Sequence, residues 1–166
     1  MMTDDEINDK YESGQDRLIQ EIDRIKLPAL VEKIKSNPNY MVIDNDSQSV
    51  GDWNDVKKSQ LIESFIINFP VMPIVLYQRS DHTYEVLDGK QRLKAIVDFY
   101  SNKLVLSGLE VKTELNGCTY ATLPYHAKTV LNRTHSLSLI SIIPSEDANP
   151  EEIAKLIEVV ANRLNS

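Results

Sequence analysis

The residues best suited to chemistry form one short run, in which a carboxylate, a glycine, two basic side chains and an amide follow directly on one another. This run is Asp88-Gly89-Lys90-Gln91-Arg92. Lys90, Gln91 and Arg92 all donate hydrogen bonds, and two of them carry positive charge, which suits a bound phosphate. Asp88 lies four residues before Arg92, so its carboxylate can pair with Arg92 or hold a metal ion or a water beside a bound anion.

The flanking residues predict a strand, a sharp turn and a helix around this run. The residues before it are β-prone and apolar, and Asp88-Gly89 is a typical turn dipeptide. The three donors then fall in the first helical turn, where unpaired backbone N–H groups and the positive end of the helix dipole favour an anion. The helix is predicted from apolar residues at positions i, i+3, i+4 and i+7, namely Leu93, Ile96, Val97 and Tyr100.

A second interpretation needs no ligand. Asp88 can act as the helix N-cap and form an i,i+4 pair with Arg92. Spacing alone favours this second interpretation, because short motifs match many unrelated sequences.

Length, composition and charge limit the class of protein. A chain of 166 residues with 42% hydrophobic residues predicts one domain with an adequate core. The net charge of −7 argues against general affinity for nucleic acid, so any DNA contact is expected to be indirect or local. Cys118 has no second cysteine to pair with, which indicates a reducing compartment such as the cytoplasm. We expect no membrane span, since no apolar run approaches about 20 residues.

The expected fold is a compact α+β domain, with a mixed sheet and helices packed on it. Residues 1–16 are predicted to be a flexible acidic arm and residues 17–166 a single domain. Residues 18–25 suit either a helix or a strand. Helices are expected to begin at Pro28, at Asn54 or Asp55, at Lys90, at Leu123-Pro124 and at Asn149-Pro150, and strands to cover residues 40–43, 74–77, 83–87 and 137–143, with a second hairpin formed by 103–106 and 109–115.

The order of these motifs resembles the N-terminal domain of GmrSD-type restriction enzymes, within the ParB/sulfiredoxin-like superfamily. The resemblance runs from about residue 26 to the end. It implies binding of a nucleoside triphosphate and its hydrolysis, in a protein of restriction or phage defence. The matching segments are Trp53, 58–64, Pro70 to Pro73, 74–77, 85–93, Asn116-Gly117, Leu123-Pro124 and 137–143.

The resemblance also assigns roles to individual residues. It places Gly89, Lys90, Gln91 and Arg92 at the phosphates, with Gln48 as a neighbour. Asp88 and Arg92 become the candidate catalytic residues, and Asp88 becomes the candidate ligand of Mg²⁺. The central run is therefore interpreted as a nucleotide site.

The sequence departs from the family at two positions. Lys90 replaces the first Gln of the usual Asp-Gly-Gln-Gln-Arg motif, which keeps a donor and adds a charge. Ser49 stands where the family commonly has an Arg after the Gln that Gln48 matches, so a guanidinium that could clamp a phosphate is missing. We therefore expect hydrolysis to be slow or absent while binding persists. No nuclease motif is found in the sequence.

The end of the chain leaves two alternatives open. Residues 162–166 resemble the start of a family segment that normally continues, so the chain is either a fragment or a naturally shortened form. The runner-up function is a catalytically degenerate module that binds or inhibits a fuller family member. Its partner would be a larger nuclease or a second copy of the chain. Either would dock on a surface that includes the apolar stripe of the last helix, formed by Ile153, Ile157, Val160 and Leu164.

Overall fold

The computed structural model describes residues 1–12, 18–43, 51–133, 136–145 and 149–164, and these contain a five-stranded mixed sheet. In spatial order the strands are β1 (Ile19–Lys26), β5 (Ser136–Ile143), β3 (Ile74–Gln78), β4 (Tyr84–Asp88) and β2 (Met41–Val42). The pairs β1–β5 and β3–β4 are antiparallel, whereas β3–β5 and β2–β4 are parallel. The expected α+β fold with a mixed sheet is confirmed, and its membership of the ParB/sulfiredoxin-like superfamily stays a prediction.

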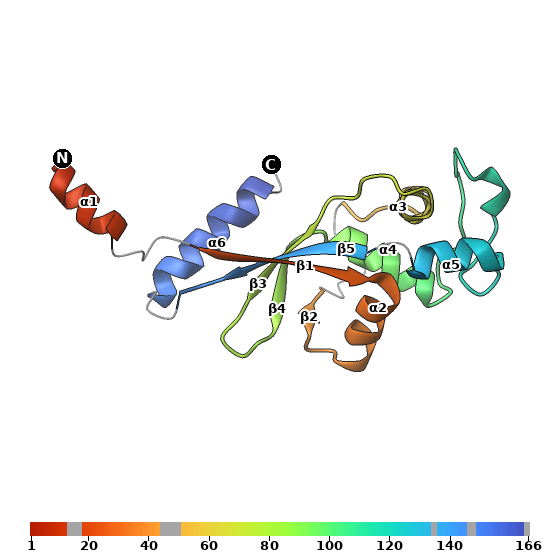
Figure 1. Cartoon of the computed structure of the whole chain (residues 1–166), viewed down its shortest axis with the longest axis horizontal. Coiled ribbons are helices and arrows are strands. Elements are labelled where there is room, and N and C mark those ends of the chain that lie inside the picture. Colours follow the sequence, from red (N-terminus) through yellow and green to blue (C-terminus); the bar gives the residue numbers. More distant parts are fainter. Residues whose placement is uncertain (13–17, 44–50, 134–135, 146–148, 165–166) are drawn as a thin grey trace.

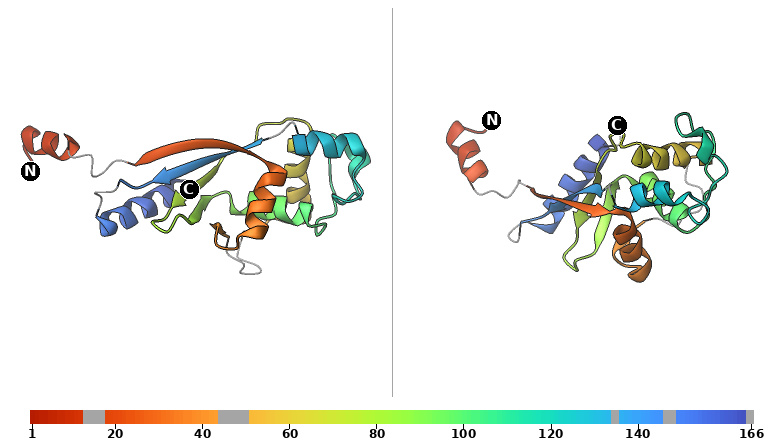
Figure 2. Two further views of the ribbon diagram at one scale, coloured as in Figure 1. Left: turned by 60° about the horizontal axis from the view of Figure 1, so that its bottom comes forward. Right: turned by 45° about the vertical axis from the view of Figure 1, so that its right-hand side comes forward.

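Helices cover both faces of this sheet, as Figures 1 and 2 show. One face carries several helices, and the other carries the C-terminal helix, whose Ile157 packs with Val75 of β3 and Leu87 of β4. The helices in chain order are α1 (Asp4–Glu12), α2 (Leu27–Ser36), α3 (Asp55–Ile66), α4 (Lys90–Tyr100), α5 (Tyr125–Arg133) and α6 (Pro150–Leu164).

Alternation along the strands divides the core into two clusters. Ile74 and Val86 pack with α2, α3, α4 and α5 in the larger cluster, whereas Val75 and Leu87 pack with Ile157 of α6 in the smaller one. Successive strand residues point to opposite faces, so each pair of neighbours contributes to both clusters. The central strand–turn–helix is thereby anchored on both sides.

The N-terminal region gives a strand and a helix. Residues 19–26 form β1, which resolves the alternatives left open by the sequence, because they pair with β5 along its whole length. The expected acidic arm contains α1, none of whose residues is buried and which lies apart from the sheet (Figure 1). Whether this arm is flexible stays a prediction. Among the described residues, no helix is long and apolar enough to cross a membrane.

The predicted second hairpin at residues 103–115 is wrong. The segment is irregular apart from a short 3-10 helix, η1 (Thr113–Leu115). Its backbone is held by buried side chains of α3: Glu63 accepts hydrogen bonds from the N–H groups of Val111 and Lys112, at 3.1 and 2.8 Å. Its leucines enter the larger cluster from this irregular backbone, so apolar periodicity gave the wrong element.

The spacing of the apolar residues in α3 predicts a buried stripe, and one member of it is misplaced. The stripe is Val56, Leu61, Ile62, Phe65 and Ile66. The side chain of Val56 is 39% exposed, whereas Leu61, Ile62 and Phe65 are buried as expected. Val56 lies in the first turn of the helix, beside Gly108. The helix begins after Asn54, whose side chain accepts a hydrogen bond from the backbone N–H of Lys57.

Candidate functional site

The turn between β4 and α4 is built around Gly89. Its φ of +108° lies in a region that favours glycine, and Gly89 is the N-cap of α4 without a side-chain hydrogen bond. A Cβ at this position would overlap the side chain of Ile74 and lie 3.2 Å from Arg92 Nη2. The alternative in which Asp88 is the N-cap is therefore wrong, because Asp88 is the last residue of β4 and Gly89 takes the cap position. The first turn of α4 has no side-chain cap at its N-cap position.

Arg92 joins the turn to the start of β3. Its Nη2 donates to the carbonyl oxygen of Pro73 at 2.8 Å and to Asp88 Oδ2 at 3.3 Å. The side chain is only 15% exposed, so the predicted i,i+4 pair is formed in a partly buried position. The buried Nε has no hydrogen-bond partner among the described residues. The Nη2 of Arg92 thus ties α4 to β3 and β4, whereas its Nε donates to no group of the described residues.

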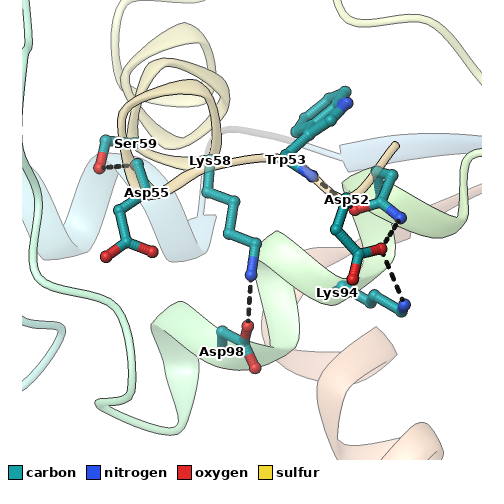
Figure 3. A network of polar contacts seen from close by, with 8 residues as sticks. Asp52, Trp53, Asp55, Lys58, Ser59, Lys94 and Asp98 are labelled. Carbon is teal, nitrogen blue, oxygen red and sulfur yellow. Dashed lines mark hydrogen bonds and ion pairs between the residues drawn. The ribbon is translucent and has the colours of Figure 1, made fainter. Parts of the chain in front are cut away.

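Gln91 links the first turn of α4 to the segment before α3. Its Oε1 accepts a hydrogen bond from the backbone N–H of Trp53 at 3.1 Å, and its Nε2 donates to Asp52 Oδ1 at 2.7 Å. Asp52 also pairs with Lys94 at 3.5 Å, as Figure 3 shows. These contacts fix the positions of Asp52 and Trp53 beside α4. Gln48 and Ser49 themselves lie outside the described residues.

A pocket of about 460 Å³ opens at this turn. Two cations and two carboxylates contribute to it, so its formal side-chain charge is balanced. An anion in this pocket would therefore depend on backbone N–H groups and on any accompanying cation. The lining residues are Trp53, Glu85, Val86, Leu87, Asp88, Gly89, Lys90, Gln91, Arg92 and Ala161.

The structure thus brings together five of the six residues that the sequence singles out, namely Asp88, Gly89, Lys90, Gln91 and Arg92. It adds Glu85 and Ala161, which sequence reasoning missed. Glu85 could have been predicted from the sequence, since it lies two residues before Leu87 in a predicted strand and so shares its face. Ala161 could not, because its position depends on how α6 packs on the sheet.

The described residues contain no group of three or more His, Cys, Asp or Glu side chains that could hold a metal ion. Asp88 is one carboxylate at the pocket, and a magnesium ion commonly takes one or two carboxylates together with phosphate oxygens and waters. The residues present therefore fit a metal that arrives with a phosphate ligand.

The comparison with protein families identifies the chain. The model of the GmrSD restriction endonuclease N-terminal domain matches residues 27–163, which includes the whole turn and pocket. The chain belongs to this family. As a GmrSD N-terminal domain it is related to proteins of restriction and phage defence. No curated protein and no solved structure matches it significantly.

Proposed function

We propose that this GmrSD-type domain binds a nucleoside triphosphate, with its phosphates at the N-terminus of α4. The observation that carries the proposal is the turn at Gly89, where a helix without a side-chain cap begins at the pocket. The backbone N–H groups of its first turn and the helix dipole suit an anion. Lys90 and Arg92 supply charge-assisted donors beside them.

A divalent cation belongs to the proposal. Asp88 and Glu85 offset the charges of Lys90 and Arg92 in the pocket, so a highly charged triphosphate needs further positive charge. Asp88 would hold Mg²⁺ in the pocket, and the ion would supply the positive charge that offsets the phosphates. Binding should therefore be tighter with Mg²⁺ than without it. Hydrolysis would be weak if Ser49 leaves the phosphates without the family's guanidinium.

The first prediction tests the site through Arg92→Ala. Removing a charged hydrogen-bond donor should weaken triphosphate binding by about 1.5–3 kcal/mol. It should also lower stability, because Arg92 donates to the carbonyl oxygen of Pro73. Isothermal titration of the wild type and the variant with nucleoside triphosphates and with inorganic triphosphate, with and without Mg²⁺, measures the binding.

Lys58→Ala is the matched control. Lys58 of α3 forms an ion pair of 3.0 Å with Asp98, which lies further along α4 (Figure 3). The side chain of Lys58 is 17% exposed, close to the 15% of Arg92. This variant should lose stability and keep its affinity for triphosphate, since Lys58 does not line the pocket. If the wild type binds neither nucleotide nor inorganic triphosphate, or if both variants bind equally well, the proposed function is wrong.

A further inference from the structure

A larger groove lies between α6 and the sheet. Its volume is about 1020 Å³, just above the range of about 300–1,000 Å³ that small-molecule sites occupy. One wall comes from Tyr77 of β3 and Leu87 of β4, and the other from Ile153 and Ile157 of α6. These four side chains are apolar or aromatic. Polar and charged side chains also line the groove, among them Gln78, Arg79, Asp81, His82, Glu85 and Glu158.

This groove adjoins the pocket at α4. Glu85, Leu87 and Ala161 line both cavities. Along β4, Glu85 precedes Asp88 by three residues, a distance of about 10 Å at the usual rise of about 3.3 Å per residue. A ligand that extends from the turn along β4 therefore passes Glu85 and enters the groove.

The chemistry along this path changes in the order that a nucleotide requires. Backbone N–H groups and cations lie at the α4 end, as described above. The Glu85 carboxylate lies at the junction, and carboxylates in nucleotide sites accept hydrogen bonds from ribose hydroxyls. Tyr77, which pairs with Glu85 in the β3–β4 register, follows in the groove, where an aromatic ring can stack on a base.

We propose that the groove under α6 holds the ribose and base of the bound nucleotide, with Glu85 at the ribose and Tyr77 at the base. This inference rests on the proposed function, because it takes the phosphates to lie at α4. Glu85 is available for this role: its side chain is 41% exposed, and it pairs with Arg79 at 3.2 Å, on the same hairpin. A ribose hydroxyl can share that carboxylate with Arg79, since an ionised carboxylate has several acceptor positions.

Titration of ATP, GTP, CTP, UTP and inorganic triphosphate in the presence of Mg²⁺ tests the groove separately from the phosphate site. The wild type should bind at least one nucleoside triphosphate about tenfold or more tightly than inorganic triphosphate. Tyr77→Ala should weaken that nucleotide roughly fivefold or more and leave inorganic triphosphate unchanged. Tyr125→Ala, at a tyrosine that is 72% exposed and outside the groove, should change neither affinity.

A second variant avoids the packing of the groove wall. Glu85→Gln should reduce the preference for the ribonucleotide over its 2′-deoxy form, with little change in melting temperature. Equal wild-type affinity for nucleotides and inorganic triphosphate would overturn the groove assignment and leave the phosphate site standing. Equal losses for both ligands in Tyr77→Ala, or an unchanged ribose preference in Glu85→Gln, would also overturn it. Absence of binding by every ligand would overturn both proposals.

Discussion

The two faces of the sheet are covered very differently. On one face, α2, α3, α4 and α5 enclose a large cluster that includes Phe99 and Ile96, both fully buried. On the other face, α6 is the one helix among the described residues that packs on a small cluster of Val75, Leu87, Ile142 and Ile157. The larger groove lies only on this second face, within the described residues.

The difference shows how one sheet can serve two purposes. Close packing on the first face fixes β3, β4 and α4, and so fixes the geometry of the turn between β4 and α4. The second face is packed less closely, and the groove between the sheet and α6 leaves room for a ligand. Most of the folding free energy should therefore come from the first face, and ligand specificity from the second.

The largest expected effect compares the same substitution on the two faces. Ile96→Ala removes a fully buried side chain from the larger cluster, and Ile157→Ala removes one that is 8% exposed in the smaller cluster. Ile96→Ala should lower the free energy of unfolding by about 2–5 kcal/mol. Ile157→Ala should lower it by about 2 kcal/mol or less, because α6 can move toward the sheet and fill the cavity. Urea unfolding of both variants measures the costs. Equal costs would remove the proposed division between the two faces.

The next effect concerns how the irregular segment at residues 101–118 is held on the first face. Glu63 is 6% exposed and accepts two backbone hydrogen bonds from this segment, so Glu63→Leu, which removes the acceptor, should cost about 1–3 kcal/mol. Glu110→Leu, at an exposed glutamate of the same segment, is the control and should have little effect on urea unfolding. A Glu63→Leu protein as stable as wild type would mean that the two hydrogen bonds do not stabilise the segment.

The strand–turn–helix was predictable from sequence because its signals are local. A β-prone run, a turn dipeptide and an amphipathic helix follow one another, and each element is specified by its own residues. The sequence does not decide whether Asp88 or Gly89 is the N-cap of α4, because both residue types are common at that position. In the structure Gly89 is the N-cap, with a positive φ, and Asp88 remains in β4.

The second hairpin and the groove could not be predicted, because both depend on contacts distant in sequence. Glu63 holds the backbone of Val111 and Lys112 across 48 and 49 residues. Ala161 reaches the pocket only because α6 crosses β4, which no pattern in α6 specifies. The apolar stripe of that helix was recognisable from its spacing, and Leu164 at the end of the stripe is 40% exposed, as expected.

The smallest expected effect tests the packed face by pH. Burial, and secondarily the nearby Tyr120, raises the pKa of Tyr100 at the end of α4, and its hydroxyl donates to Asn132 Oδ1 at 2.7 Å. The unfolded tyrosine titrates near pH 10, so the unfolded state loses this proton first and the free energy of unfolding should fall as pH rises above about 10. Tyr100→Phe should cost about 0.5–1.5 kcal/mol at neutral pH and reduce that fall.

Urea unfolding between pH 8 and 11, on the wild type and Tyr100→Phe, measures the difference in slope. Tyr125→Phe is the matched control, since that side chain is 72% exposed and its hydroxyl is not enclosed by the larger cluster. The first face keeps water and charge out of its core, so the ionised form of Tyr100 is not accommodated there. An identical pH dependence in wild type and Tyr100→Phe would show that this face opens to solvent at the end of α4. The contrast between a packed face and an open one would then apply only to the part of the sheet nearer the turn at Gly89.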